Sequence, residues 1–420
     1  MKVAVVGAGI SGISAAEYLS EFCDVTVFEK NVRIGGHADT QCIDVDGQTI
    51  DVDTGFIVFN PENYPRFYQL LKKYRVEYQD SDMSFAVSNR LSGLEYNATS
   101  VNRLFCQRKN LLNPKFYRMI KDITRFYKEA YELLKADYSK PNISLGEYLK
   151  INQYGDYFIH EHIIPMASAL WSGEAKLIME FPARYLVAFM NNHKMMQLDQ
   201  RPVWKTIRGG SKNYLEAISK QAAFEIKTAA SIRTIKRKED GVDIVFNDET
   251  EKFNAVIMAC HSDQVLSLLE TPSKKEQEVL SAIRYQKNEV CLHRDTSCLP
   301  ENRKAWASWN VIRDEKSKDR CTVSYYMNLL QSLPTETPVI VSLNMNDDIE
   351  PNKAWKYLEY EHPVYTQETI DAQQKRKLIQ GKAHTYFCGA YWGWGFHEDG
   401  ARSGMEAAQA LLDDMNYVRE

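Results

Sequence analysis

The sequence lacks several features that define common classes of protein. Its eight cysteines form no C-x-x-C pair and no metal-ligand spacing, so we expect reduced thiols, no disulfide framework and no metal site. No window approaches the roughly 18 consecutive apolar residues of a membrane-spanning helix. The first residues, MKVAVVGAG, also lack the basic start and small-residue cleavage site of a signal peptide. We therefore expect a cytoplasmic protein.

An excess of charge of one sign is also absent. The 52 basic and 56 acidic residues give a net charge of -4. The basic residues form only short clusters, such as the one at residues 235–238. Such a chain has no overall attraction for polyanions, so no nucleic acid partner is predicted. A peripheral contact with the inner face of a membrane would leave no trace in composition or net charge. The oligomeric state also stays open. With 420 residues, 44% of them hydrophobic, the chain is globular and long enough for two or more domains.

The first thirty residues predict a β-α-β unit. A β-branched run at residues 3–6 leads into the glycine-rich segment G-A-G-I-S-G, which is followed by helical spacing and then by a second apolar run that ends at Glu29. In this pattern Gly7 permits a tight turn, Gly9 lets the backbone approach a pyrophosphate, and Gly12 lets the helix pack on the sheet. The carboxylate of Glu29 is placed to accept hydrogen bonds from ribose hydroxyls, which disfavours NADP. These residues predict a dinucleotide site.

The continuation distinguishes FAD from NAD. A second glycine pair, Gly35 and Gly36, follows Glu29 closely, and the strand that ends in Asp-Thr-Gly at residues 53–55 comes next. These two turns can approach the far side of the pyrophosphate, the ribityl chain and the flavin edge. A nicotinamide-binding domain needs neither turn, so FAD is the predicted cofactor.

The rest of the chain alternates between helical and strand-like segments. Helical spacing predicts helices at residues 64–74, 114–134, 211–221, 369–378 and 402–415. Strands are expected as a hairpin within residues 230–246 that turns at Asp240-Gly241, at 255–259, across a strand-rich stretch at 285–343, and at 385–388. We predict an α/β fold in which residues 1–80, 200–275 and 380–420 form a discontinuous FAD domain. Residues 81–199 and 276–379 would form the substrate domain.

These motifs resemble a known superfamily. GAGISG, Glu29, RIGGH and DTG are similar to the FAD signature of the flavin-containing amine oxidases and phytoene desaturases. Segments 192–214, 292–310, 361–365 and 387–404 resemble a bacterial and plant branch of predicted NAD/FAD-binding oxidoreductases. Members of this branch are often encoded beside, or fused to, methyltransferases of the cyclopropane-fatty-acid-synthase type. The resemblance implies a glutathione-reductase-like Rossmann domain with an inserted mixed α/β domain, noncovalent FAD, and work on acyl chains. It leaves open an association with such a methyltransferase or with a membrane.

Two departures from the superfamily pattern bear on the chemistry. His37 stands where amine oxidases usually have the arginine of a G-G-R motif. The segment EVCLHRD, residues 289–295, offers no match to the lysine that holds a water against the flavin in amine oxidases. Both departures weaken the expectation of amine oxidation and leave that of FAD binding intact.

The resemblance also assigns the cofactor site residue by residue. Gly389 and Ala390 are expected at the pyrophosphate or ribityl chain, and Gly400 and Ala401 are expected to open the last helix toward the flavin O2 atom, with Asp399 as its N-cap. The predicted cofactor-binding residues are Gly7, Gly9, Ser11, Gly12, Glu29, Lys30, Gly35, Gly36, His37, Thr54, Gly55, Phe56, Ile232, Gly389, Ala390, Gly400 and Ala401.

The substrate side is predicted from aromatic and polar residues near the same motifs. The predicted catalytic residues are His293, Trp309, Asn328, Tyr391 and Trp394. Each has a structural alternative, because a lone histidine can be a hydrogen-bonded core residue and the aromatics can be packing between domains. Glu398 and Asp399 could be paired catalytic carboxylates, but adjacent residues diverge at a helix start, which favours capping.

We expect an FAD-dependent oxidoreductase that abstracts hydride from an apolar substrate, most directly by desaturating a fatty-acyl or related lipid chain. Three alternatives stay open. The first is an amine oxidase that releases hydrogen peroxide, and the second is a flavin-dependent isomerase or mutase without net oxidation. The third is a flavin-free binding protein of the same fold, similar to the escort proteins of prenylated GTPases.

Overall fold

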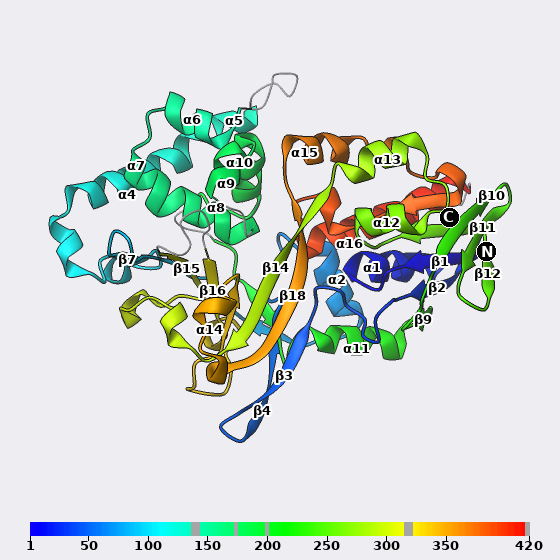
Figure 1. Ribbon diagram of the computed structural model, residues 1–420, viewed down its shortest axis with the longest axis horizontal. Helices are drawn as coiled ribbons and strands as arrows, with labels where there is room; N and C mark the ends of the chain where they lie inside the picture. The colour runs from blue at the N-terminus through cyan, green and yellow to red at the C-terminus, as the bar shows by residue number, and fades with distance from the viewer. Residues whose placement is uncertain (136–142, 172–174, 198–200, 315–321, 416–420) are drawn as a thin grey trace.

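A computed structural model describes residues 1–135, 143–171, 175–197, 201–314 and 322–415. Its two largest sheets lie in different halves of the molecule (Figure 1). The first is a five-stranded parallel sheet of order β19-β13-β1-β2-β9. Its strands are β1 (Lys2–Val6), β2 (Asp24–Phe28), β9 (Glu225–Lys227), β13 (Ala255–Met258) and β19 (Thr385–Phe387). They come from the three segments predicted for the FAD domain.

Two helices cover one face of this sheet. Helices α1 (Ile10–Leu19) and α16 (His397–Asp414) share an apolar core with the buried valines of β1 and β2. The two helices approach each other closely, since a Cβ at Gly404 would lie 2.2 Å from the Ser11 carbonyl oxygen. Small residues are therefore required in α16, and its glycines do not interrupt the helix.

The opposite face carries a small antiparallel sheet and two helices. The predicted hairpin within residues 230–246 is confirmed as β10 (Thr234–Lys238) and β11 (Gly241–Val245), with β12 (Thr250–Phe253) alongside. Helices α12 (Ser262–Leu268) and α13 (Lys274–Ser281) pack beside it around buried Val265 and Leu280.

The second large sheet has seven strands in the order β18-β14-β17-β16-β15-β6-β7. The strands are β6 (Phe85–Asn89), β7 (Leu94–Asn97), β14 (Arg284–His293), β15 (Trp309–Arg313), β16 (Thr322–Tyr326), β17 (Ile340–Leu343) and β18 (Ala354–Val364). Most neighbours are antiparallel, and β15 pairs with β6 in parallel. Because side chains alternate along a strand, one face carries apolar residues such as Val290 and Tyr325, and the other carries polar residues such as Ser324 and Ser342.

A helical lobe lies beyond this sheet, at the left of Figure 1. Its longer helices are α4 (Pro114–Glu129), α6 (Leu145–Ile151), α8 (Ile164–Trp171), α9 (Ala175–Glu180) and α10 (Ala183–Asn192). The predicted helix at 114–134 divides into α4 and α5 (Glu132–Lys135), since residues 130 and 131 lie outside both. Buried Phe116, Phe126 and Leu186 belong to the largest hydrophobic core of the molecule.

The remaining helices and strands are shorter or lie between these layers. They include α2 (Pro65–Lys73) and α11 (Lys212–Gln221), which confirm the predicted helices at 64–74 and 211–221. The others are β3 (Thr40–Val45), β4 (Gln48–Asp53), β5 (Tyr78–Asp80), β8 (Lys205–Ile207), α3 (Val101–Leu104), α7 (Asp156–Phe158), α14 (Met327–Leu330) and α15 (Gln367–Gln374). In the described part of the chain, no helix has both the length and the apolar character needed to cross a bilayer.

The start of the last helix was predicted wrongly. Helix α16 begins at His397 and has Phe396 as its N-cap, so it starts about one turn before residue 402. The histidine and acidic residues at its start have no helical apolar spacing, which hid this turn from the sequence pattern.

Candidate functional site

A large cavity of about 1460 Å³ is lined by residues from both large sheets and from the helical lobe. Pockets for one small ligand usually hold roughly 300–1,000 Å³, so this cavity has room for a cofactor and a second molecule. We call the "cofactor end" the lining residues within 6–56, 230–285, 359–362 and 389–391, together with His397. The "substrate end" comprises the lining residues within 57–204, 290–358, 363–365 and 394–396.

The first glycine turn forms one wall of the cofactor end. Gly9 is the N-cap of α1 without a side-chain cap, so the first N–H groups of the helix have no side-chain partner there. A Cβ at Gly9 would meet no heavy atom within 4 Å, whereas one at Gly12 would lie 1.9 Å from the Gly7 carbonyl oxygen. Gly9 and Ser11 therefore line open space, and Gly12 sets the distance between turn and helix from outside the cavity. This geometry suits a pyrophosphate.

Glu29 lies at the carboxyl end of β2 and lines the cavity while only 6% exposed. One carboxylate oxygen accepts a hydrogen bond from the Ala8 N–H at 2.9 Å. The other accepts from the backbone and side-chain nitrogens of Asn31, both at 3.0 Å. The carboxylate is thus held beside the glycine turn, where ribose hydroxyls are expected.

The second glycine pair contacts the first turn directly. The Gly35 N–H donates to the Ala8 carbonyl at 2.8 Å, and both Gly35 (φ 112°) and Gly36 (φ 58°) have left-handed backbone angles. A Cβ at Gly55 would lie 2.0 Å from the His37 carbonyl oxygen. Three glycines therefore bring loops from separate segments together as bare backbone. Lys30, Thr54, Phe56 and Ile232 also line this end, as do Gly389 and Ala390.

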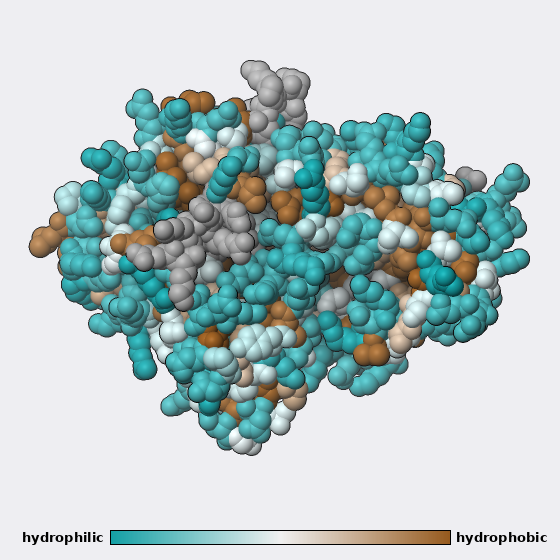
Figure 2. All heavy atoms as spheres, in the orientation of Figure 1, coloured by the Kyte–Doolittle hydropathy of each residue, from teal (hydrophilic) through white to brown (hydrophobic). Residues whose placement is uncertain are grey.

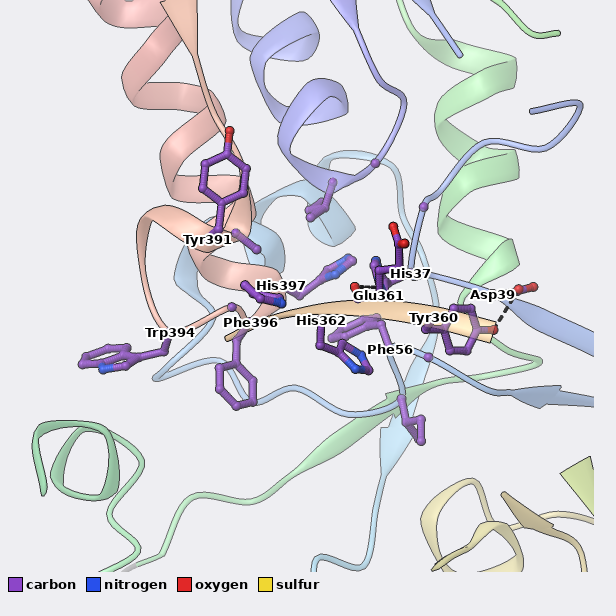
Figure 3. A pocket seen from close by; sticks show the side chains of 18 of the residues that line it. His37, Asp39, Phe56, Tyr360, Glu361, His362, Tyr391, Trp394, Phe396 and His397 are labelled. Carbon is purple, nitrogen blue, oxygen red and sulfur yellow. Dashed lines mark hydrogen bonds between the residues drawn. The ribbon is translucent and has the colours of Figure 1, made fainter. Parts of the chain in front are cut away.

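Three histidines, His37, His261 and His362, lie close together at the cofactor end, and Figure 3 shows His37 and His362. The ring centroid of His37 lies 5.9 Å from that of His261 and 5.4 Å from that of His362. Burial lowers the pKa of His37, and burial with the neighbouring imidazoles lowers the pKa of His261 to about 4 and that of His362 to about 3. These side chains are neutral at pH 7, so His37 does not reproduce the fixed positive charge of an arginine.

A polar network joins β18 to the segment around Asp39 and Thr54. The Tyr360 hydroxyl donates to Asp39 at 2.9 Å and lies 2.7 Å from the Thr54 hydroxyl. Figure 3 shows Tyr360 and Asp39 joined beside His37. These contacts hold the seven-stranded sheet against the cofactor end.

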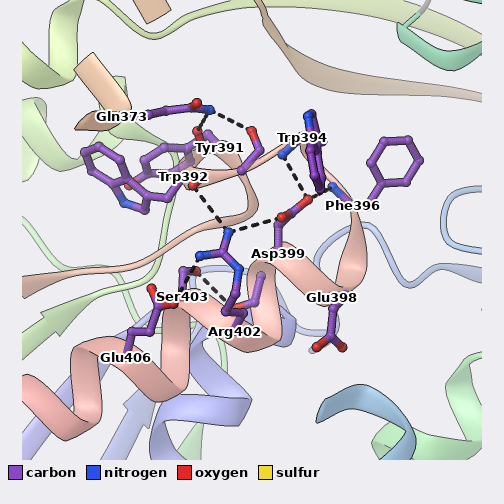
Figure 4. Close-up of polar contacts among 12 residues, drawn as sticks. Gln373, Tyr391, Trp392, Trp394, Phe396, Glu398, Asp399, Arg402, Ser403 and Glu406 are labelled. Atoms are coloured by element: carbon purple, nitrogen blue, oxygen red, sulfur yellow. Dashed lines mark hydrogen bonds and ion pairs between the residues drawn. The ribbon is translucent and has the colours of Figure 1, made fainter. Parts of the chain in front are cut away.

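The acidic pair at residues 398 and 399 has structural partners, and Figure 4 shows those of Asp399. Asp399 accepts hydrogen bonds from the Trp394 and Phe396 N–H groups at 3.0 and 3.1 Å and pairs with Arg402 at 3.2 Å. Glu398 accepts from the Arg66 and Phe67 N–H groups, both at 3.1 Å, at the start of α2. Both carboxylates cap backbone, in agreement with the capping interpretation, although Asp399 is not the N-cap of its own helix.

Gly400 and Ala401 do not line the cavity, contrary to the predicted role at the flavin. Helix α16 begins one turn earlier, so a Cβ at Gly400 would instead lie 2.6 Å from Ile10 of α1. The cavity is lined at this point by His397, whose ring stacks on that of Phe56 with 3.7 Å between the ring centroids. The start of α16, where Asp399 accepts the Phe396 N–H, therefore reaches the cavity at His397.

The aromatics of the last loop separate into two groups. Trp394 and Phe396 lie at the substrate end, where both pack on Phe189. The ring centroid of Phe189 lies 5.8 Å from that of Trp394 and 4.8 Å from that of Phe396. Tyr391 points away from them (Figure 3) and packs on Trp392 at 5.1 Å. It lines the cavity beside Gly389 and Ala390, so the structure separates it from Trp394 and Phe396, and its role stays a prediction.

Two of the other predicted catalytic residues lie outside the cavity. His293 is fully buried on the opposite face of β14, where its Nε2 atom lies 2.8 Å from the Ser342 hydroxyl. Asn328 lies in α14 and donates to the carbonyls of Thr335 and Thr337. Strand alternation turns His293 away, and Asn328 closes a loop, so neither is assigned to the site. Trp309 does line the substrate end, with its ring edge-on to Tyr325 at 5.0 Å.

The sequence interpretation missed His162, which lines the substrate end while 2% exposed. The Tyr96 hydroxyl donates to the Glu161 carbonyl at 2.8 Å and lies 2.9 Å from Nδ1 of His162. Since this hydroxyl has one hydrogen, it accepts from Nδ1–H, and Nε2 of His162 keeps a free lone pair. Burial and the charge of Arg201 lower the pKa of His162 to about 3. His162 lies in a turn of π-helix at residues 159–163. Because such a turn has no recognisable sequence pattern, the sequence carries no signal for this residue.

His261 and His362 were also missed as lining residues. His261 follows β13 directly, at the carboxyl edge of the parallel sheet where ligands bind. That position was a usable signal, whereas His362 reaches the site only through the pairing of β18 with β14.

Two cysteines, Cys260 and Cys388, lie close to the cofactor end. Burial raises the pKa of Cys260 and of Cys388 to about 12, so both are protonated thiols at pH 7.

These features define a class of protein. A glycine turn, a ribose-binding carboxylate and a second glycine pair meet at the carboxyl ends of parallel strands, opposite a second sheet, as in two-domain dinucleotide-binding enzymes. The chain belongs to the family of flavin containing amine oxidoreductases, whose model matches residues 10–300. FAD is therefore its cofactor and it is an oxidoreductase, which confirms both expectations.

Curated relatives and solved structures agree with this assignment. The chain is 27% identical over 178 residues to a 4,4'-diapophytoene desaturase (4,4'-diaponeurosporene-forming) of Staphylococcus aureus (strain bovine RF122 / ET3-1). The match covers 39% of this chain and 35% of the relative, so it spans about a third of the length of that relative.

Two solved structures have the same fold. Cyclohexylamine oxidase from Brevibacterium oxydans IH-35A has a TM-score of 0.70 at 15% identity, covering 99% of each chain. A CLA-producing fatty acid isomerase from P. acnes has a TM-score of 0.67 at 14% identity, covering 98% of each chain. At these identities the likeness shows the fold alone and confirms the predicted two-domain α/β architecture.

Proposed function

We propose that this enzyme removes hydride from an apolar chain, as in the desaturation of a fatty-acyl or related lipid. The observation that carries the proposal is the chemistry of the substrate end. Among the described residues that line it, none is a carboxylate, and Arg201 is the one charged side chain. A protonated amine would enter this space without a counter-ion and close to a positive charge, which is unfavourable in a cavity of low polarity.

The residues of the cofactor end fit FAD. The first turn of α1 is placed to bind the pyrophosphate, Glu29 the ribose, and the start of α16 at His397 the flavin. FAD supplies a two-electron acceptor there, reoxidised by oxygen or another acceptor. The protonated thiols of Cys260 and Cys388 favour noncovalent attachment.

The chain's own residues at the substrate end orient the substrate and exclude water. Phe85, Trp309 and Tyr325 form an aromatic surface on the seven-stranded sheet, and Phe189 with Trp394 forms another wall. A flexible chain held between such walls loses the freedom that would otherwise oppose a reactive alignment.

The lysines of this region also favour an apolar substrate over an amine. Lys30 is the one lysine among the described lining residues, and it lies at the cofactor end. Lys287 of β14 points outward and pairs with Glu359 at 2.9 Å. No described lysine is therefore placed beside the substrate.

The test compares two substrate classes on the purified holoenzyme without oxygen. Acyl lipids and primary amines of equal chain length are mixed with the oxidised enzyme, and flavin absorbance is followed. We expect bleaching with acyl chains and none with amines. Bleaching by amines alone would contradict the proposal and favour an amine oxidase.

A second candidate is isomerisation of an unsaturated chain without net oxidation. The fold shared with a fatty acid isomerase and the apolar substrate end are compatible with it. It predicts product only after the flavin has been reduced chemically, with no consumption of an acceptor during turnover.

A further inference from the structure

Four apolar side chains protrude from the helical lobe. Val101 of α3 is 75% exposed, Leu111 46%, Leu112 90% and Tyr117 47%. Leu111 and Leu112 end a 3₁₀ turn, and Tyr117 lies in the first turn of α4, where its hydroxyl donates to the Leu111 carbonyl. Figure 2 shows hydrophobic side chains projecting at the left edge of the molecule, beside α4. We call these four residues, with the basic residues named next, the lobe surface.

The lobe surface is strongly basic. The same stretch of chain, residues 101–121, carries six exposed basic residues: Arg103, Arg108, Lys109, Lys115, Arg118 and Lys121. No acidic residue occurs from 100 to 121, and the next one, Asp122, is buried and pairs with Arg125. In the described part of the chain none of the six forms an ion pair with a carboxylate. A chain with a net charge of -4 therefore concentrates uncompensated positive charge here.

The lobe surface adjoins the substrate end of the cavity. Ala98 and Thr99 line that end and lead within two residues into α3. The 3₁₀ turn at residues 303–305 packs on α3 and adds Arg303 and Lys304, with Glu301 as the acidic neighbour. Apolar side chains, positive charge and the wall of the cavity thus meet in one place.

We propose that the lobe surface docks the enzyme on an anionic lipid bilayer, so that the substrate passes between the membrane and the cavity. Leucine side chains enter the boundary between head groups and acyl chains, while lysine and arginine side chains stay at the head groups and are attracted by anionic lipid. The charge is spread over α3, the 3₁₀ turn at residues 108–112 and α4, which suits a diffuse negative surface better than a single acidic peptide. The purpose of docking rests on the proposed lipid substrate, but binding to the membrane does not. The test of membrane binding therefore does not depend on turnover.

The test is co-sedimentation of the oxidised holoenzyme with vesicles, without substrate. We expect weak binding to phosphatidylcholine and much tighter binding when phosphatidylglycerol is included, with loss at high salt. The pair Leu111→Ser and Leu112→Ser should weaken binding roughly tenfold or more, and Arg108→Glu with Lys109→Glu by a similar factor. The far-ultraviolet circular dichroism of each variant checks its fold.

A matched control replaces exposed apolar residues elsewhere. Ile151 (69% exposed, α6) and Leu378 (52% exposed) lie outside the lobe surface, and the pair Ile151→Ser and Leu378→Ser should bind vesicles as the unchanged protein does. An equal loss of vesicle binding in this control variant, or no binding of the unchanged protein to any vesicle, would overturn the proposal. A protein partner would then be the alternative occupant of the lobe surface.

Turnover then separates this proposal from the function of the site. The Leu111/Leu112 variant should oxidise detergent-dispersed acyl substrate normally and vesicle-borne substrate slowly. If no acyl lipid is oxidised while vesicle binding depends on the lobe surface, the proposed substrate fails and the docking role stands.

Discussion

The two ends of the cavity are built in different ways. One wall of the cofactor end is bare backbone, because Gly9, Gly35 and Gly36 bring main chain from separate loops to the space expected to hold FAD. The substrate end is mostly side chain, contributed by β-strands, the helical lobe and the last loop. A site made of backbone tolerates little change and has a recognisable motif, whereas a site made of side chains can change with few consequences for the fold. The following predictions test that contrast.

The largest effect is expected at the first glycine turn. Gly12→Ala would place a Cβ 1.9 Å from the Gly7 carbonyl oxygen, so the turn and helix cannot keep their distance. We expect a loss of roughly 3 kcal/mol or more of folding free energy and of bound flavin. Urea unfolding and the flavin absorbance of the purified protein measure both.

Gly9→Ala is the matched control, because its Cβ meets no protein atom within 4 Å. This variant should fold normally and lose flavin, since the added methyl group points into the space for the cofactor. If both variants fold equally well, the two glycines do not have the separate roles assigned to them.

Acid should destabilise both ends through buried histidines. The pKa values of His162, His193, His261, His293, His362 and His397 are lowered by burial to about 3 or 4, below the ordinary 6.5. The unfolded chain therefore takes up protons first as the pH falls from about 6.5 to 4. Each histidine contributes up to about 1.4 kcal/mol of lost stability per pH unit.

Stability should thus fall by several kcal/mol across this window, as measured by urea unfolding at successive pH values. Asp53 opposes the trend, because burial raises its pKa to about 6, and burial raises the pKa of Glu398 and of Asp399 in the same direction. His362→Gln should make the slope shallower, and His160→Gln on the surface should leave it unchanged. Equal slopes in all three proteins would contradict the assignment of neutral buried histidines.

A smaller and more local effect is expected at the substrate end. Phe189 is 1% exposed and packs on both Trp394 and Phe396. Phe189→Ala should lower stability by about 3 kcal/mol through the void it leaves, without loss of flavin per folded molecule. A rise in KM for the acyl substrate with retained flavin would sharpen the contrast, whereas loss of flavin would show that the two ends depend on each other.

The smallest effect is expected at the acidic pair between the ends. Glu398→Gln removes the charge that accepts two N–H groups at the start of α2 but keeps one acceptor oxygen. We expect a loss of about 1 kcal/mol in thermal or urea unfolding and an unchanged kcat. A large fall in kcat with normal stability would restore the catalytic role of Glu398.

The comparison of the two ends also explains which residues could be predicted. Of the predicted cofactor residues, the glycine turns, Glu29 and Gly389 line the cavity, because each belongs to a local motif with a defined backbone geometry. Gly400 and Ala401 were misplaced because the start of a helix depends on caps such as Asp399, whose partners were not evident from the pattern.

The substrate side was less predictable for a different reason. His293 and Trp309 come from two strands of one sheet, β14 and β15, and only the alternation and register of the strands decide which of the two residues faces the cavity. His162 reaches it through a π-helical turn of the helical lobe, far along the chain from any recognised motif.

The sequence by itself determined the parallel sheet, the glycine turns, Glu29 and hence the cofactor, because these depend on local backbone rules. Tertiary structure alone decided the face of each strand, the cluster of His37, His261 and His362, and the apolar substrate end. Those features depend on register and on contacts between segments hundreds of residues apart, which no local pattern encodes.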